Sequence, residues 1–445
     1  MNDSCQLGIR ALALIAIPAL LTGCQGAQVE KTMAPPRVNV VLISIDTLRP
    51  DHLGCYGYAA PSSPRIDEFC LESVVFRQAI AQAPSTLHSH ASILSSLLPH
   101  HHQATWGGKT RLPVEALTLA EVLQQNGFST AAFTGGGQMD RVFGLDQGFD
   151  LYDQPGQEHF LGTVQRGIEW LDSQAREPFL LFLHSYEVHH PYTPSQENLE
   201  LFEQAYSGSL PDEISIDVLR EINNGERALE EGDLAHIIAA YDAEIRSVDA
   251  AFGVLIDALK ERDLYGETLI VFTSDHGEEF GEHGIIGWHS HTLYDELLRI
   301  PLIFKLPASR QAGTVVEELV RGLDIPPTVV GEVGLKIPPE FEGESLVERI
   351  AKPEIEPLFA VSRLDRRPGH DVDSIRTGEW KLMREGLFNL QKDPEELWLV
   401  SDAYTIGRLR DRLAEMIAAR EPHEEVEVVP SDKNLEELRA LGYIQ

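Results

Sequence analysis

Carboxylate and imidazole side chains closely follow apolar stretches of the sequence. The stretches cover residues 38–45, 179–183 and 268–273. Asp46 comes directly after the first of them, and Asp275 and His276 come just after the third. Carboxylate oxygens together with an imidazole nitrogen suit a hard or borderline divalent cation. The pattern therefore predicts one divalent metal ion held by Asp46, Asp275 and His276.

The segment 83–94 (APSTLHSHASIL) has the features of a helix that begins near Pro84 and Ser85. Its apolar face would consist of Leu87, Ala91, Leu94 and Leu98. Thr86 would then lie at the helix N-terminus, where free backbone N–H groups and the helix dipole favour an anion. The alternative is that Ser85 or Thr86 serves only as the N-cap of this helix.

The elements that must position these groups can be predicted from the same stretches. All three are mainly apolar runs, which is typical of strands buried on both faces, and residues 128–133 are a weaker fourth candidate. Amphipathic helices lie between them, and the clearest runs from Ile238 to Leu259. This alternation predicts an α/β domain with a doubly wound, mostly parallel sheet. In such sheets ligands bind at the carboxyl ends of the strands.

Changes in composition divide the chain into four parts. We expect a signal peptide (1–23), a polar tether (24–37), the α/β domain (38–353) and a small C-terminal α+β subdomain (354–445). Residues 194–232 are acidic and loop-like, which indicates an insertion in the α/β domain. In the C-terminal part, residues 374–383 have the pattern of a short antiparallel strand and residues 406–419 that of a helix.

The N-terminal segment has the pattern of a secretion signal. Arg10 precedes an apolar run over 11–21, which is shorter than the roughly 20 residues of a membrane span. The residues Leu21-Thr22-Gly23-Cys24 resemble a bacterial lipobox, in which the cysteine is acylated and becomes the new N-terminus. We expect Cys24 to anchor the protein by lipid to a membrane of the bacterial cell envelope, facing the periplasm or the exterior. A plain secreted protein is the alternative.

Two further cysteines, Cys55 and Cys70, would remain in the folded domain. Cell-envelope compartments are oxidising, so these two residues can pair. The sequence leaves open whether they form a disulfide or stay as two buried free thiols.

The charge of the chain excludes one class of partner. Its 445 residues include 36 Lys and Arg against 70 Asp and Glu, a net charge of −34. A field of that sign repels nucleic acid, so we expect no nucleic-acid partner. It also slows the approach of an anionic substrate, and any anion site must therefore be locally positive.

Eight further motifs stand out along the chain: VLISIDTLRPDHLGCYGY, APSTLHSHASILSSLLPH, FLLFLHSYEVHHPY, FTSDHGEEFGEHG, HSHTLYDELLRIPLIF, GLDIPPTVV, SIRTGEWKLM and LEELRALGYI. Together they resemble the sulfatase family of the alkaline phosphatase superfamily. They occur in the family's order and cover about 38–445. The resemblance implies hydrolysis of a sulfate or phosphate-type ester through a covalent enzyme intermediate. It also implies a bound divalent metal ion, which is Ca²⁺ by family resemblance and Mn²⁺ or Zn²⁺ as alternatives.

The resemblance also assigns roles to individual residues. Asp46, Asp275 and His276 match family metal ligands, and Thr86 stands where the family has its nucleophile. That nucleophile is a formylglycine made from Cys or Ser, which Thr cannot become by the same route, although Thr is the nucleophile in some phosphodiesterase relatives. We expect Thr86 to be the nucleophile and a fourth contact to the metal, since coordination activates a hydroxyl.

Three histidines are candidates for contact with the transferred group. His90 and His189 are candidate catalytic residues, and His189 and His291 are candidates for binding the substrate's oxygens. Each of the three is open to a second interpretation as a structural or surface imidazole.

Two functions fit these motifs. The first is a metal-dependent, sulfatase-like hydrolase of sulfate or phosphate/phosphonate esters that forms a covalent intermediate on Thr86. The second is a non-catalytic protein of the same fold that binds an anionic glycan or a protein partner. The intact Asp46, Asp275 and His276 favour the first, and the altered nucleophile motif favours the second.

Overall fold

The structure is a computed structural model that describes residues 38–105, 109–156, 158–203, 206–351, 358–364 and 371–444. The predicted signal peptide, the tether and Cys24 lie outside the described residues. Within the described ranges, none of the helices combines the length and hydrophobicity that a bilayer span requires.

An eight-stranded sheet forms the centre of the domain. Its order is β11 (Thr314–Arg321), β2 (Val74–Ile80), β10 (Arg299–Lys305), β7 (Thr268–Thr273), β1 (Asn39–Ile45), β6 (Phe179–Ser185), β4 (Ser129–Phe133) and β5 (Leu151–Asp153). Only β10 runs antiparallel to its neighbours, β2 and β7. The prediction of a mostly parallel sheet is confirmed, and β1, β6, β7 and β4 are the four strands expected from the sequence.

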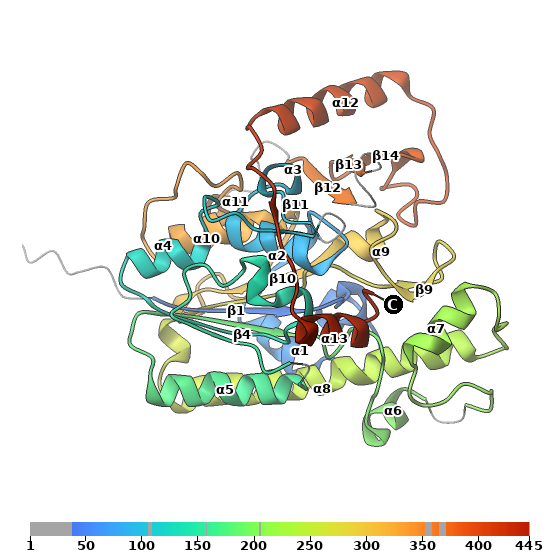
Figure 1. Cartoon of the computed structure of the whole chain (residues 1–445), viewed down its shortest axis with the longest axis horizontal. Coiled ribbons are helices and arrows are strands. Elements are labelled where there is room, and N and C mark those ends of the chain that lie inside the picture. Colours follow the sequence, from blue (N-terminus) through green and yellow to red (C-terminus); the bar gives the residue numbers. More distant parts are fainter. Residues whose placement is uncertain are drawn as a thin grey trace, which may run out of the picture. The chain divides into compact units, whose positions relative to one another are not determined.

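Alternate residues of β1 show why helices cover both faces of this sheet. Val40 and Leu42 pack into one buried apolar layer, and Val41 and Ile43 pack into the other. The first layer is covered by α2 (Thr86–Ser95), α4 (Leu119–Gln125) and α10 (Ile325–Glu332), and the second by α1 (Pro64–Leu71), α5 (Phe160–Ser173) and α8 (Asp233–Glu261). In Figure 1, α5 and α8 run below β1 and β4, and α2, α4 and α10 lie above them.

Two helical predictions differ from the structure in their limits. The helix expected to begin near Pro84 and Ser85 and to include Leu98 ends at Ser95, because Ser96 takes a left-handed backbone conformation with φ of 57°. Leu98 therefore does not lie on this helix and belongs to a different apolar cluster. The region 194–232, expected to be loop-like, contains α6 (Gln196–Phe202) and α7 (Ile216–Asn223), whose N-caps are Ser195 and Ser215.

The C-terminal part confirms the predicted small antiparallel sheet. Its strands are β12 (Ala360–Leu364), β13 (Val372–Arg376), β14 (Trp380–Met383) and β15 (Gly386–Asn389), and α12 (Ala403–Ala418) packs on β13 and β14. The single strand expected over 374–383 is instead a hairpin, because Thr377 turns the chain between β13 and β14.

Shorter elements complete the described chain. They are α3 (Pro99–His102), α9 (Asp295–Leu298), α11 (Val347–Ala351), β3 (Thr110–Arg111) paired with β16 (Val426–Glu427), and β8 (Glu279–Phe280) paired with β9 (Ile286–Trp288). Cys55 and Cys70 form a disulfide, which settles the alternative left open by the sequence.

The last helix, α13 (Asp432–Ala440), returns to the α/β domain beyond the end of β4. The Asn434 side-chain amide donates to the carbonyl oxygen of Gly137 at 2.9 Å, and the Gly137 N–H donates to Glu437 Oε2 at 3.1 Å. These contacts bring the end of the described chain to the same edge of the sheet as Asp46.

Candidate active site

The predicted metal ligands converge at the carboxyl ends of β1 and β7. Asp46 directly follows β1, and Asp275 and His276 follow β7 by two and three residues. The two strands are parallel neighbours in which Ser44 is opposite Thr273, so both strands end at the same level of the sheet. The N-terminus of α2 brings Thr86 to this point from the helical layer.

The four side chains lie within contact distance of one another. His276 Nε2 is 3.9 Å from Asp46 Oδ1 and 3.4 Å from Asp275 Oδ2. Thr86 Oγ1 donates to Asp46 Oδ2 at 3.1 Å and lies 3.5 Å from His276 Nε2. One ligand atom from each of Asp46, Asp275 and His276 lies within 4.8 Å of the others, which is a spacing that a single ion can bridge.

The electrostatics of this cluster fit a cation. Asp46 and Asp275 are both 0% exposed, and Asp46 Oδ1 and Asp275 Oδ2 have no hydrogen-bond partner within the described structure. Burial raises the pKa of Asp46 to about 6 although His276 opposes this shift, and burial together with Asp46 raises the pKa of Asp275. Two adjacent buried carboxylates with free oxygens need a positive partner, and a divalent ion with oxygen and imidazole ligands provides one.

No side-chain hydroxyl caps the N-terminus of α2. Ser85 holds the N-cap position with an extended backbone, but its hydroxyl pairs with His88 Nδ1 at 2.7 Å. The Thr86 hydroxyl points to Asp46 and not to a backbone N–H of the helix. The alternative in which one of these two residues is only an N-cap therefore has no support in this geometry.

His90 lies one turn along α2 from Thr86, close to the predicted metal ligand Asp275. Its Nδ1 contacts the Thr86 carbonyl oxygen at 2.9 Å and Asp275 Oδ2 at 3.4 Å, and its Nε2 contacts Ser44 Oγ at 2.9 Å. The ring is completely buried, and burial lowers the pKa of His90 to about 3 despite the Asp275 carboxylate. The structure therefore brings His90 to the Asp275 carboxylate and the backbone of Thr86.

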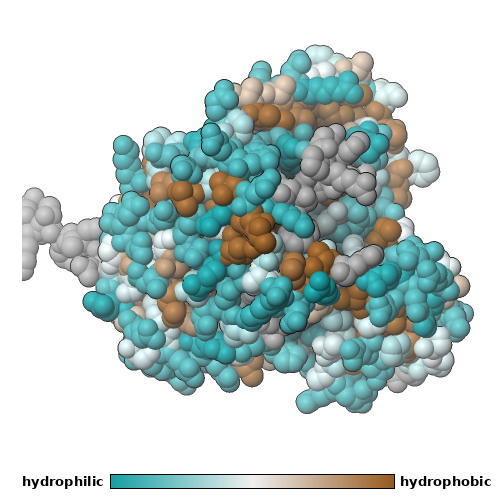
Figure 2. Space-filling model, in the orientation of Figure 1, coloured by the Kyte–Doolittle hydropathy of each residue, from teal (hydrophilic) through white to brown (hydrophobic). Residues whose placement is uncertain are grey.

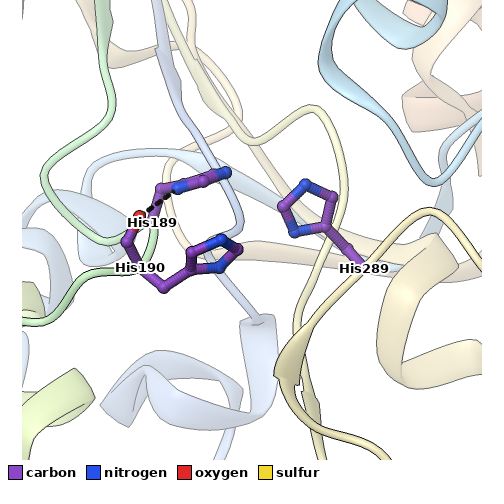
Figure 3. A group of neighbouring side chains, drawn as sticks. All are labelled: His189, His190 and His289. Atoms are coloured by element: carbon purple, nitrogen blue, oxygen red, sulfur yellow. Dashed lines mark hydrogen bonds between the residues drawn. The ribbon is translucent and has the colours of Figure 1, made fainter. Parts of the chain in front are cut away.

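The other two predicted histidines lie in different surroundings. His291 Nε2 pairs with Glu279 Oε2 at 2.5 Å, and its Nδ1 lies 2.9 Å from the carbonyl oxygen of His289. His189 is buried, and with His190 and His289 it forms a second group whose ligand atoms all lie within 4.8 Å of one another (Figure 3). His190 and His289 were not predicted as site residues, although His190 directly follows the candidate His189 and His289 lies two residues before the candidate His291.

Tyr443 is a further site residue that the sequence did not identify. Its hydroxyl lies 2.7 Å from Thr86 Oγ1 and 3.2 Å from His189 Nε2, so it stands between the predicted nucleophile and the histidine group. The closing motif LEELRALGYI contained this residue, but nothing in that pattern showed that α13 folds back over the sheet edge.

A pocket of about 280 Å³ opens beside the histidine group. It is lined by Tyr186, Glu187, His189, His190, Glu244 and Leu441, among others. Burial, together with the charge of nearby Glu187, raises the pKa of Glu244 to about 8. A pocket wall that is neutral at this position repels an anion less than an ionised carboxylate would.

Comparison with known proteins identifies the family. Residues 38–335 match the sulfatase family, and residues 281–422 match the family described as N-sulphoglucosamine sulphohydrolase, C-terminal. The chain belongs to the sulfatase family. It is therefore an ester hydrolase of the alkaline phosphatase superfamily, and the family predicted from the motifs is confirmed.

Named relatives of this sulfatase-family chain are distant in sequence. The ulvan-active sulfatase of Formosa agariphila is 27% identical over 385 residues, which cover 78% of this chain and 72% of that protein. The multifunctional alkaline phosphatase superfamily protein PehA of Trinickia caryophylli is 24% identical over 403 residues, covering 71% and 77%. The crystal structure of the phosphonate monoester hydrolase of Agrobacterium radiobacter matches with a TM-score of 0.71 at 20% identity, covering 86% and 96%, which shows the common fold.

Proposed function

We propose that this sulfatase-family protein is a metal-dependent hydrolase of sulfate or phosphate-type esters that uses Thr86 as its nucleophile. The observation that carries the proposal is the position of Thr86 Oγ1, which contacts Asp46, His276 and Tyr443 at the N-terminus of α2. The relatives named as an ulvan-active sulfatase and a phosphonate monoester hydrolase support both ester classes.

Asp46, Asp275, His276 and Thr86 are the residues that would hold the metal ion. A bound divalent cation supplies Lewis-acid charge, which lowers the pKa of a hydroxyl and stabilises negative charge on the transferred group. Neutral water or hydroxyl groups alone would not offset the two carboxylates of this site, so the cation also makes the site able to accept an anion.

The protein's own groups then position the reaction. Thr86 Oγ1 loses its proton to solvent and attacks the sulfur or phosphorus atom. The bond to the ester oxygen breaks, that oxygen takes up a proton from solvent and leaves as the alcohol, and the sulfuryl or phosphoryl group stays on Thr86. Asp46 accepts the hydrogen bond of the attacking hydroxyl, and Tyr443 fixes its direction from the other side. His189 lies beyond the Tyr443 hydroxyl, on the side from which the pocket admits the substrate. Water then hydrolyses the new ester and restores the threonine.

Replacement of the nucleophile tests the proposal directly. Thr86→Ala should lower kcat on the best substrate of a nitrophenyl sulfate, phosphate, phosphodiester and phosphonate panel by at least about a thousandfold. The melting temperature should change little, because the Thr86 hydroxyl does not cap α2. Mass spectrometry of wild-type protein quenched during slow turnover should find the sulfuryl or phosphoryl mass on the Thr86 peptide.

Ser85→Ala is the matched control. It removes the neighbouring hydroxyl, which pairs with His88 and not with Asp46, so kcat should stay within a few-fold of wild type. Near wild-type turnover by Thr86→Ala would contradict the proposed nucleophile. If the metal-loaded wild type hydrolyses no member of the panel, the non-catalytic binding function is favoured.

We also propose that Cys24 anchors the protein by lipid to a membrane of the cell envelope. The support is the apolar run followed by Leu21-Thr22-Gly23-Cys24. Cys24→Ala should move the protein from the membrane fraction to the soluble fraction of the producing bacterium. Unchanged fractionation of that variant would contradict the anchor.

A further inference from the structure

Three buried imidazoles, His189, His190 and His289, face one another beside the proposed nucleophile (Figure 3). Their ring centroids lie between 4.2 Å and 5.6 Å apart. His189 and His190 come from the segment after β6, and His289 follows β9, so two separate parts of the chain build the group. The proposed function above needs only the cation at Asp46 and Asp275 and assigns no ion to these histidines.

Hydrogen bonds at Nδ1 fix the orientation of each ring. His189 Nδ1 donates to the His190 carbonyl oxygen at 2.5 Å. His289 Nδ1 lies 3.0 Å from Glu278 Oε1, and His190 Nδ1 lies 3.4 Å from Glu278 Oε2. Because each Nδ1 faces an acceptor, the proton of each neutral ring belongs on Nδ1 and the lone pair on Nε2. Each Nε2 then keeps its lone pair, which His189 shares with the Tyr443 hydroxyl at 3.2 Å.

Glu278 has the position of an outer-shell carboxylate. It is 0% exposed, its two oxygens contact two of the three histidines, and Tyr192 donates to Oε2 at 3.2 Å. Histidines that bind a metal through one nitrogen commonly donate from the other to a carboxylate or a backbone carbonyl.

The space next to His190 is kept open. Its Nε2 is buried and has no hydrogen-bond partner among the described residues. Gly442 approaches from the tail after α13 with φ of 80°, and a Cβ atom there would lie 3.2 Å from this nitrogen. A side chain at position 442 would thus enter the space that a ligand of His190 requires.

We propose that His189, His190 and His289 bind a second divalent cation through Nε2, with Glu278 as the outer-shell carboxylate. Three imidazoles and an open fourth position suit Zn²⁺ and similar borderline ions, whereas the carboxylate-rich site at Asp46 also accepts harder ions. The two sites adjoin, because the rings of His276 and His289 have centroids 4.6 Å apart. The Tyr443 hydroxyl, 3.2 Å from His189 Nε2, lies on the side of the open position. Any contact between His189 and the transferred group then passes through this ion.

Metal stoichiometry tests the second site without reference to activity. The full-length folded protein is freed of metal with a chelator, dialysed against ZnCl₂ and analysed by elemental mass spectrometry. We expect two zinc ions per chain in the wild type and one in His190→Gln and in His289→Gln. Asp275→Asn should also keep one ion, which is the ion bound by His189, His190 and His289.

The matched control is His236→Gln. His236 is a buried histidine that contacts Glu203 and the Pro211 carbonyl oxygen, away from both sites, so this variant should keep two ions. Co²⁺ titration of the unmodified wild type, followed by visible absorption, gives the stoichiometry without relying on a variant that folds. One ion per chain in the wild type, or two ions in both His190→Gln and His289→Gln, would overturn the second site. If the wild type binds two ions but neither turns over a panel substrate nor forms an adduct on Thr86, the second site stands and the proposed function is contradicted.

Discussion

The Tyr443 hydroxyl directly links the segment after α13 to the proposed nucleophile, Thr86. Tyr443→Phe keeps the ring and removes the 2.7 Å contact to Thr86 Oγ1. One hydrogen bond of this kind is worth about 1–1.5 kcal/mol, so kcat should fall roughly tenfold while KM changes little. Tyr265→Phe is the control, because its hydroxyl contacts Glu72 near the amino end of β7, at the opposite edge of the sheet. A kcat for Tyr443→Phe within twofold of wild type would show that this hydroxyl does not act on Thr86.

A second residue-scale prediction concerns the pocket carboxyl Glu244. Burial and Glu187 raise its pKa to about 8 from an ordinary 4.5, so between these pH values the folded protein holds a proton that the unfolded chain releases. The free energy of unfolding therefore falls as pH rises through this window, by a total on the order of 5 kcal/mol. Glu244→Gln keeps an acceptor for the Thr193 N–H and should lose less stability than wild type between pH 5 and pH 8.5.

Urea unfolding at several pH values measures this difference. Glu158→Gln changes another carboxyl of the same pocket, which pairs with Arg166, and should leave the wild-type pH dependence in place. If the free energy of unfolding changed with pH by the same amount in wild type and in Glu244→Gln, a raised pKa at Glu244 would be contradicted.

Residues that follow buried strands were predictable, and residues placed by distant packing were not. Asp46, Asp275 and His276 were found because parallel strands that end together bring their next residues together. Thr86 was assigned from its place in the family motif, because the local signal of a helix start also fits a plain N-cap. His190 and His289 were missed because their grouping depends on Glu278 and on the path of the loop around β9, which no local pattern encodes. Tyr443 depends on the docking of a helix almost 360 residues after Thr86.

At the scale of elements, the docking of α13 onto the glycines after β4 controls where Tyr443 lies. Gly137 has φ of 59°, and a Cβ there would lie 2.6 Å from Leu441 Cδ1 in a buried contact. Gly137→Ala should therefore displace the tail, lower kcat about tenfold and increase hydrogen exchange over 432–444. Gly127→Ala has the matching backbone strain at φ of 85° but open space around the new methyl group. That control should lose stability of about 1 kcal/mol and keep its kcat. Equal kcat values for the two variants would mean that α13 does not depend on this contact.

Strand prediction identified β1, β4, β6 and β7 and missed the other four strands of the same sheet. β1, β6 and β7 are buried along their whole length. β2 and β11 contain residues such as Arg77 and Glu317 that reach the surface, and both have register irregularities, which break the pattern of a buried strand. The antiparallel direction of β10 follows from its connection to β7 through the site loops and could not be predicted from its composition.

At the scale of the whole molecule, net charge and local site charge have opposite signs. The chain carries a net charge of −34, and hydrophilic residues cover most of the face shown in Figure 2, with smaller hydrophobic patches between them. The proposed cations provide a compact positive region inside this negative field. An anionic ester is therefore repelled at long range and attracted only within the site.

This opposition predicts an unusual response to salt. The Debye length falls from about 30 Å at 0.01 M to about 8 Å at 0.15 M ionic strength, so added salt screens the distant carboxylates more than the buried ions. For a small anionic nitrophenyl ester and metal-saturated protein, KM should fall about threefold or more across this range while kcat stays constant. NaCl and potassium acetate at equal ionic strength should give the same change, which separates screening from specific ion binding. A KM that rises with both salts would mean that, at long range, attraction to the positive site outweighs repulsion by the net charge of −34.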